Sequence, residues 1–431
     1  MTHRLLRPLL LAAAVASSGL APLAGFDDVH AWEARVAQTN RGGLPLVAQN
    51  TLPDQDSYSW AGYQWVQGYL SLAQATGDGR YMDFAKDILE HMLANRDDIR
   101  FAGRSLDAPY YYAPTHYLFH AGKPAPGWRR NYGRGKAVAV LTDGRICEIF
   151  LRWCELARRS FPNYEDDIAR YLDRVHETIE MHQPSFREIG PVDVGPSIYT
   201  PNPARADGGF RHWWHNNSVA ELPPSDEPKI FSGQLPINHS ATMARAMLAY
   251  DRLRGTTLYQ DKVRMVVNYF LNSLDPARPD KAVWEYDPVN SRRQEIEDID
   301  HAGIIMPLVI EAYRDGGFGV TGEHIRRLIA TYHGCFDPAT GAVRRFIDGS
   351  DDPNIKPHDA YRVRASVAYY GWLWLSQFDP TILDKARRAY EVHFAPRNDS
   401  SGFVMGGWAN LIYWEMVRDG TAVIHDRAPA P

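Results

Sequence analysis

A helical-hairpin pattern that recurs along most of the chain constrains its fold more than any other feature. Each copy has the end of one helix, a polar turn, and a second helix with apolar residues at i, i+3, i+4 and i+7. Such helix pairs cannot bury their apolar faces alone, so they stack on one another. The copies occupy residues 69–93, 151–179 and 247–274, with weaker ones at 309–333 and 373–394.

This pattern predicts an all-α fold, an (α/α)n toroid in which inner helices surround an axis and outer helices cover them. Strand signals are few and short, and the sequence leaves no room for a large separate β-domain. An open α-solenoid such as a tetratricopeptide array would show a constant period of ~34 residues, which is absent. We therefore expect residues 25–431 to form a single toroid with long aromatic-rich loops at 104–135 and 184–235.

The first 24 residues are predicted to be a signal peptide. Arg4 and Arg7 precede a short apolar run, and small residues follow near Ala21 and Ala24, which is the order of a secretory signal. The run is too short to span a bilayer, which takes about 20 apolar residues. The sequence thus predicts a periplasmic or secreted protein without a membrane span.

Charge and motifs argue against several other classes of protein. The formal net charge is −5, and no long basic run exists, so nucleic acid is not an expected partner. There is no His-Glu-x-x-His, no paired Cys-x-x-Cys and no Asp-rich calcium loop, so no metal site is predicted. No strand leads into a Gly-rich phosphate loop, and no cofactor is expected.

Polar residues collect where the first helix of each pair is expected to begin. Convergent helix N-termini present unpaired N–H groups and positive dipole ends, which attract anions. An anionic polysaccharide lying across this end of the ring is therefore a natural ligand, although Asp143, Ser240 and Asp300 are also ordinary N-cap candidates. The polar starts are residues 56–60, 142–145, 238–240, 297–301 and 361–364.

Asn238, His239 and Tyr286 form the candidate catalytic group. Asn and His are hydrogen-bonding groups that can hold a carboxylate, and Tyr can carry a proton, so together they suit proton removal beside a uronic acid carboxylate. A Tyr with an ordinary pKa of ~10 needs nearby positive charge to act as a base near neutrality. His301, at another expected helix start, is a further catalytic candidate, with a structural role equally open.

Candidate substrate-binding residues lie in the aromatic loops and at the helix starts. Flat aromatic rings beside Arg, His and Asn suit a sugar chain, whose ring faces are apolar and whose rim carries hydroxyls. The alternative is that these aromatic residues fill a large core. The candidates are Gln234, Arg292, Trp213, Trp214, His215, Tyr58, Trp60, Arg145 and Arg364.

Three short motifs resemble alginate and glucuronan lyases built on α/α toroids. They are Asn-His-Ser at 238–240, Trp-Glu-Tyr at 284–286 and Glu-Asp-x-x-His-Ala at 297–302. The nearest likeness is polysaccharide lyase family 38, with a more distant likeness to the family 5 alginate lyases. The hairpin pattern carries the resemblance over most of the chain, but the motifs cover only residues 234–313.

The resemblance implies β-elimination at a uronate without a cofactor. Asn238 and His239 would neutralise the substrate carboxylate, and Tyr286 would act as base, acid or both. The family pattern also has an Arg shortly before the Tyr, and here Arg278 lies eight residues before it, so Arg292 or Arg293 is the substitute. The glutamate expected upstream of the His is unmatched, with Gln234 near its place.

Other functions stay open at this point. An inverting glycoside hydrolase on the same toroid needs two carboxyl groups ~6.5–9.5 Å apart, and Asp143 with Glu297, Asp298 or Asp300 is a candidate pair. A uronate C5-epimerase begins with the same proton removal as a lyase. A non-catalytic periplasmic sugar-binding protein needs only the aromatic surfaces. Neither the choice between alginate and glucuronan nor the oligomeric state is fixed by the sequence.

Overall fold

A computed structural model describes most of the chain between residues 29 and 423. The described ranges are 29–40, 57–100, 102, 125–132, 135–189, 199–200, 202, 204–211, 234–289, 295–337, 340–396 and 400–423. The predicted signal peptide lies outside the described residues. Within them, no helix has the length and apolar character needed to cross a bilayer.

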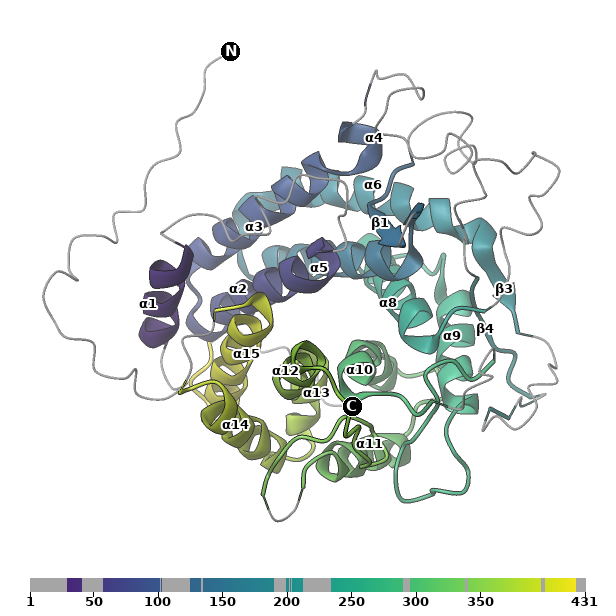
Figure 1. Ribbon diagram of the computed structural model, residues 1–431. Coiled ribbons are helices and arrows are strands. Elements are labelled where there is room, and N and C mark those ends of the chain that lie inside the picture. The colour runs from purple at the N-terminus through teal and green to yellow at the C-terminus, as the bar shows by residue number, and fades with distance from the viewer. Residues whose placement is uncertain are drawn as a thin grey trace, which may run out of the picture.

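The described helices form a closed ring of two layers, which confirms the predicted all-α toroid (Figure 1). The inner layer consists of α2 (Tyr63–Thr76), α5 (Val140–Ser160), α8 (Ile237–Arg254), α10 (Ile299–Asp315), α12 (Pro357–Ser366) with α13 (Tyr370–Leu373), and α15 (Gly402–Arg418). The outer layer consists of α1 (Val29–Asn40), α3 (Gly79–Ala94), α6 (Glu165–His182), α9 (Gln260–Asn272), α11 (Gly322–Gly334) and α14 (Thr381–His393).

The burial pattern of each helix explains its layer. Outer helix α6 buries Ile168, Tyr171, Leu172 and Val175, a spacing that gives one apolar face and leaves the other in solvent. Inner helix α15 is buried along residues 404–414 without interruption, as expected for a helix covered on both sides.

Short elements connect the helices. They are η2 (Tyr58–Gly62), α4 (Asp97–Arg100), η4 (Pro162–Tyr164), η5 (Gln183–Ser185), η8 (Trp374–Gln377), and the strands β1 (Arg129–Tyr132), β2 (Gly135–Val138), β3 (Phe186–Glu188) and β4 (Gly208–Phe210). The strands make two antiparallel ribbons, with Arg129 opposite Val138 and Phe186 opposite Phe210. This small strand content agrees with the weak strand signals of the sequence.

Several inner helices begin at the same end of the ring, as the polar helix starts predict. Near the start of α5, a Cβ on Gly144 would lie 2.4 Å from Thr242 Oγ1 in the first turns of α8. Only glycine permits this approach without a shift of one helix. The next residue, Arg145, donates from Nε to the Ser59 carbonyl oxygen in η2, at 2.5 Å, which brings the entry to α2 to the same end.

Ion pairs cross the interior of the ring between the two ends. Arg245 of α8 is buried and contacts both Glu148 of α5 and Glu311 of α10. The Tyr63 hydroxyl of α2 donates to the same Glu148 carboxylate. The axis is therefore filled by a charged, hydrogen-bonded layer, so the two ends of the ring are separate chemical environments.

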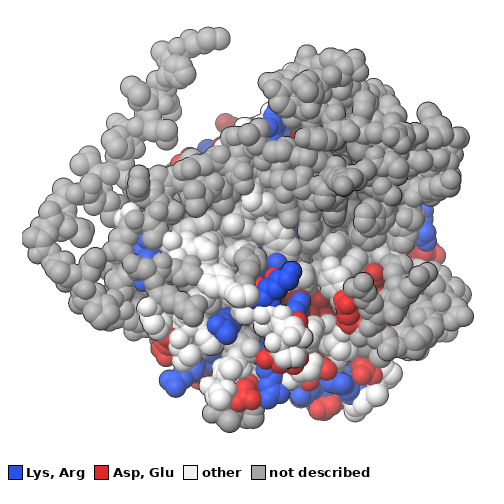
Figure 2. Space-filling view, viewed as in Figure 1, with Lys and Arg blue, Asp and Glu red and all other residues white. Residues whose placement is uncertain are grey.

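On the face shown in Figure 2, Lys and Arg are interspersed with Asp and Glu mainly in the lower half of the described surface, and the described surface above them is largely uncharged. A continuous basic stripe, the usual footprint of a nucleic-acid site, is not visible among those residues on this face.

Candidate active site

Trp60 is the centre of a cluster at the end of the ring where the inner helices begin. The guanidinium groups of Arg145 (α5) and Arg362 (α12) each lie 4.9 Å from its ring centroid. The His301 ring of α10 is 6.1 Å away in an edge-on arrangement. Three inner helices thus bring side chains to one half-buried aromatic residue in η2, and three of these four residues were predicted site residues.

His301 is held by the residue that caps its own helix. The Asp298 side chain accepts a hydrogen bond from the His301 backbone N–H at 2.8 Å, and its second oxygen lies 2.9 Å from His301 Nδ1. Pro307 lies inside α10, so His301 belongs to the first helical turn. The N-cap is therefore Asp298; the N-cap candidate from the sequence, Asp300, lies inside the helix.

The same carboxylate sets the charge of His301. Burial alone would lower the pKa of this imidazole, but Asp298, with help from Asp300 and Glu297, raises it to about 9. The pKa of Asp298 is lowered in return, because His301 outweighs the cost of its burial. At neutral pH the pair is an imidazolium and a carboxylate, with 22% of the His301 side chain exposed.

Tyr286 packs against His301. The two ring centroids are 5.3 Å apart in an edge-on arrangement. Tyr286 is half-buried, and its backbone N–H donates to the Glu295 carbonyl oxygen at 2.8 Å. Trp284, two residues earlier, is fully buried. The structure thus joins two of the four predicted catalytic residues, Tyr286 and His301, in direct contact.

Glu297 adds a protonated carboxyl group close to His301. It is fully buried, and burial raises its pKa to about 8. The Trp284 indole N–H lies 3.4 Å from one oxygen, while Oε1 has no hydrogen-bond partner. This carboxyl group is therefore largely neutral at pH 7, which the sequence alone did not reveal.

Arg362 takes the place that the sequence analysis gave to Arg364. It forms an ion pair with Asp300, with Nε 2.9 Å from Oδ2, and its guanidinium lies beside Trp60. Consecutive helical residues are rotated by about 100°, so Arg364 is about 200° around α12 from Arg362 and points elsewhere. Arg362 was within the predicted polar start at 361–364. The sequence did not show which of its two arginines faces Trp60, because that depends on the rotation of α12 about its axis.

Asn238 and His239 occupy the first turn of α8. The Asn238 side-chain oxygen accepts from the His239 backbone N–H at 3.0 Å, while its Nδ2 is buried without a hydrogen-bond partner. His239 is 9% exposed. Helices α8 and α10 are packed neighbours. Because Asn238 is fully buried, a substrate reaches its amide only if this end of the ring opens.

Gln234 and Tyr58 are placed differently from their predicted roles in substrate binding. Gln234 is buried and donates from Nε2 to the Phe210 carbonyl oxygen at 2.9 Å, so in this structure it ties down the main chain. Tyr58 has no exposed surface, its hydroxyl lies 3.1 Å from His91 Nε2, and burial raises its pKa to about 12. Tyr58 is a core residue, so its assignment to substrate binding was wrong.

Some predicted residues lie outside the described part of the chain. Arg292, with its neighbour Arg293, and the loop residues Trp213, Trp214 and His215 belong to this group. Their assignment to substrate binding stays a prediction.

The predicted absence of a metal site also stays a prediction. Glu297, Asp298 and His301 each offer a ligand atom, and these atoms lie within 4.8 Å of one another. However, both Asp298 oxygens already interact with His301, through its backbone N–H and its Nδ1. The capping and ion-pairing contacts therefore explain why these residues gather here.

Asp143, the acid named for a hydrolase pair, is not accessible. It is fully buried, accepts from the Trp128 backbone N–H at 2.9 Å, and lies 2.8 Å from His182 Nε2. It is therefore a structural tie between α5, α6 and the segment before β1.

Comparison with known proteins finds solved structures that resemble this chain in structure but share little sequence identity with it. No protein-family model matches the chain, and no curated protein matches it. A polysaccharide lyase structure is 13% identical over 85% of this chain and 92% of its own, with a TM-score of 0.45. An inactive α-1,6-mannanase variant from Salegentibacter, in complex with α-1,6-mannotriose, is 12% identical over 86% and 98%, with a TM-score of 0.47.

A glycosyl hydrolase family 88 structure from Bacteroides vulgatus is similar in the same way. It is 11% identical over 90% of this chain and 99% of its own, with a TM-score of 0.47. At such identities and scores the function has to be argued from the residues of the site themselves.

Proposed function

We propose that the protein is an enzyme that cleaves a uronic-acid-containing polysaccharide by β-elimination, with Tyr286 as the base that takes the C5 proton. The observation that carries this proposal is the contact between Tyr286 and His301, whose rings lie 5.3 Å apart. His301 is in turn fixed by Asp298. A phenol, an imidazolium and an orienting carboxylate are the parts of an activated acid–base group.

Charge makes this arrangement suitable for a tyrosine base. With its pKa raised to about 9, His301 is positive at neutral pH. A nearby positive charge stabilises a phenolate relative to a phenol. The imidazolium beside Tyr286 would supply the positive charge that a tyrosine base needs, and a proton that Tyr286 accepts from C5 can pass to the departing glycosidic oxygen.

The electron balance of the step is simple. The C5–H and C4–O bonds break, a C4=C5 double bond forms, and the proton taken by Tyr286 returns to the leaving oxygen. Negative charge develops on the substrate carboxylate as C5 loses its proton, and stabilising such charge is the largest catalytic contribution in many enzymes. Asn238 and His239 would supply this stabilisation once this end of the ring opens, because the buried Asn238 Nδ2 is a donor without an acceptor at the positive end of α8.

Trp60 and its two arginines support a sugar acid as the substrate. The half-buried indole suits an apolar sugar-ring face, and the Arg145 and Arg362 guanidinium groups lie beside it, although Arg145 is buried and Arg362 is paired with Asp300. Alginate and glucuronan both meet this description. Such polymers are extracellular, in keeping with the signal peptide that the sequence predicts.

The hydrolase alternative has weaker support, because Asp143 is buried in a structural tie and Asp298 and Asp300 are engaged with His301 and Arg362.

The test is to incubate the enzyme with glucuronan, polymannuronate, polyguluronate and a neutral polysaccharide, recording absorbance at about 235 nm and new reducing ends. A rise in absorbance on a uronan, with matching reducing ends, is the expected result. Reducing ends without absorbance would mean hydrolysis. Deuterium uptake at C5 without chain cleavage would mean epimerisation. Binding without any of these would mean a sugar-binding protein, and each of these three outcomes would overturn the proposal.

A further inference from the structure

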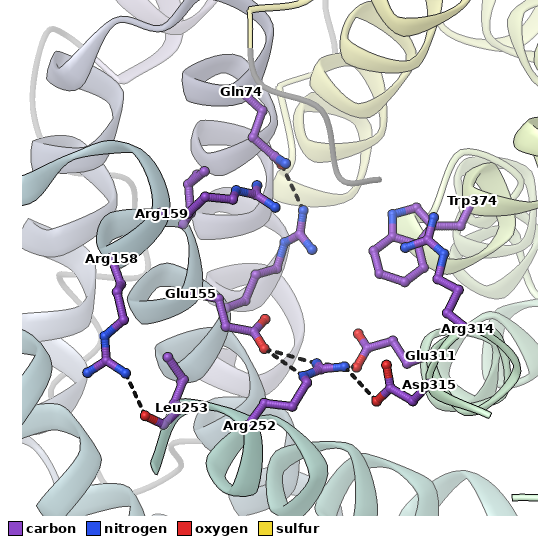
Figure 3. Close-up of a pocket in the computed structure, with 12 residues that line it drawn as sticks. Gln74, Glu155, Arg158, Arg159, Arg252, Leu253, Glu311, Arg314, Asp315 and Trp374 are labelled. Atoms are coloured by element: carbon purple, nitrogen blue, oxygen red, sulfur yellow. Dashed lines mark hydrogen bonds and ion pairs between the residues drawn. The ribbon is translucent and has the colours of Figure 1, made fainter. Parts of the chain in front are cut away.

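A separate cavity opens at the opposite end of the ring, where α5, α8 and α10 end (Figure 3). Its volume is about 400 Å³, within the size range of small-molecule sites. Arginines dominate its wall: Arg158 and Arg159 come from the last turn of α5, Arg252 from that of α8, and Arg314 from that of α10. Helix C-termini carry partial negative charge, which favours cations there.

The cavity wall holds five arginines and three carboxylates, an excess of two positive charges. The three carboxylates all contact Arg252: Glu155 at 2.9 Å, Glu311 at 2.6 Å and Asp315 at 3.2 Å. Burial would raise the pKa of Glu311, but Arg245 and Arg252 lower it to about 2. The acids are thus gathered around one arginine at one side of the cavity.

Three of the other four arginines donate to uncharged oxygens. Arg152 donates to Gln74 Oε1 at 2.9 Å, and Arg158 donates to the Leu253 carbonyl oxygen at 2.5 Å. Arg314 donates to the side-chain oxygen of Gln377. These bonds orient the guanidinium groups, and arginine stays charged at any physiological pH.

Aromatic rings fix two of these guanidinium groups further. Arg314 lies 4.2 Å from the centroid of the Trp374 ring, and Arg152 lies 3.5 Å from that of Tyr370. Such stacking holds the planar fork in one orientation. The Trp374 indole N–H also lines the cavity, and it is buried without a hydrogen-bond partner. The wall therefore offers oriented guanidinium groups and one indole N–H donor that has no acceptor.

We propose that this cavity binds a small oxyanion, either the carboxylate of an acidic monosaccharide or a phosphate. Guanidinium forks match both groups through paired, charge-assisted hydrogen bonds, and an oxyanion supplies the acceptor that the Trp374 indole N–H lacks. The site is distinct from the one around Tyr286, because the buried layer of Arg245, Glu148 and Glu311 separates the two ends of the ring.

The test is calorimetric titration of the intact protein with sodium glucuronate, inorganic phosphate and glucose. We expect at least one of the two anions to bind and glucose not to bind; the anion that binds identifies the source of the oxyanion. Kd for that anion should rise about tenfold in both Arg314→Gln and Arg158→Gln, because each removes a charge-assisted hydrogen bond. Arg388→Gln, an exposed arginine on outer helix α14, is the matched control and should change nothing.

Binding at this cavity must also be told apart from binding at the Trp60 end. A Trp60→Ala variant should bind the anion as the wild type does, whatever happens to polysaccharide cleavage. No heat with either anion would overturn the proposal, as would an unchanged Kd in both arginine variants, or an equal loss in Arg388→Gln. None of these results bears on absorbance at 235 nm, so failure here and failure of the proposed lyase activity are distinguishable.

Discussion

The two ends of the ring use charge in opposite ways. Where α10 begins, two side chains titrate just above neutral pH: the pKa of Glu297 is raised to about 8 and that of His301 to about 9. Where α8 and α10 end, the charges are permanent, with Arg252 held among three carboxylates. The end of the ring with Glu297 and His301 can therefore gain and lose protons between about pH 8 and 9. The end with Arg252 keeps its charges over this range.

Helix direction explains this difference. Positive dipole ends at the helix starts favour anionic ligands, and negative ends at the helix finishes favour arginine. A ring of inner helices that share a direction therefore has one end suited to proton chemistry on an acidic substrate and another suited to fixed positive charge. Substitutions at the two ends should therefore have different effects. Replacing a fixed charge should change stability or anion binding, and replacing a titrating group should change turnover.

The largest effect is expected inside the ring, at the ion pairs between its ends. Arg245→Met should lower the free energy of unfolding by about 3–5 kcal/mol, because it leaves Glu148 and Glu311 as buried carboxylates without this partner. Urea unfolding measures the change. Adding Glu148→Gln should recover part of the loss, since Glu311 keeps Arg252. A single variant as stable as the wild type would show that this layer contributes little.

Next in size is the effect of His301 on turnover. His301→Gln should lower kcat by about 100-fold, as expected for loss of a group that assists proton transfer, while the fold is retained. The matched control is His333→Gln, which breaks another His–Asp contact, the 2.7 Å pair of His333 and Asp379, on outer helix α11. Equal activity of both variants, measured at 235 nm, would assign His301 a structural role only.

A smaller effect is expected on the pH dependence of stability. Because the folded-state pKa of Glu297 is about 8 rather than 4.5, the folded protein keeps a proton that the unfolded chain loses between these values. Its contribution to stability therefore falls as pH rises through that window. Glu297→Gln should be close to the wild type in stability near pH 5 and exceed it at pH 8.5, since each unit of pKa shift corresponds to ~1.4 kcal/mol. Thermal unfolding of both proteins at both pH values would reveal this growing difference in stability. A difference that stays the same at the two pH values would refute the prediction.

His301 adds to the same trend. Its pKa is raised from 6.5 to about 9, so the stability from its Asp298 contact is complete below about pH 6.5 and is lost as pH rises through 9. Asp298→Asn should therefore flatten the upper part of the stability profile.

The smallest effect on turnover is expected at the far end of the ring. Arg158→Gln should change kcat and KM on a uronan by less than about twofold, because its exposed side chain contacts the Leu253 carbonyl oxygen away from Tyr286. Surface changes of this kind usually shift stability by less than ~0.5 kcal/mol. A large loss of activity would show that the two ends are coupled.

The sequence predicted the toroid because its signal is local: residues three and four apart define each apolar face, as at Tyr171 and Val175 of α6. The predicted polar helix starts also included His301, Trp60 and Arg145, which lie together at one end of the ring. These starts converge in space, so candidates far apart along the chain become neighbours.

What the sequence missed depends on helix phase and tertiary burial. Arg362 and Arg364 are equivalent by composition, and only the rotation of α12 selects Arg362. Tyr58 carries the same functional groups as an exposed tyrosine, but packing buries it against His91. The raised pKa of Glu297 arises from desolvation, a quantity set by the assembled core and not by neighbouring residues along the chain.

The central claim, that the Tyr286 end of the ring performs the elimination, is tested most directly by the initial rate at 235 nm of Tyr286→Phe on the preferred uronan. We expect the rate to fall about 1,000-fold with substrate binding retained. Tyr313→Phe, a half-buried tyrosine in the last turn of the same helix as His301, should keep near wild-type rates. A Tyr286→Phe enzyme as fast as the wild type would contradict the account.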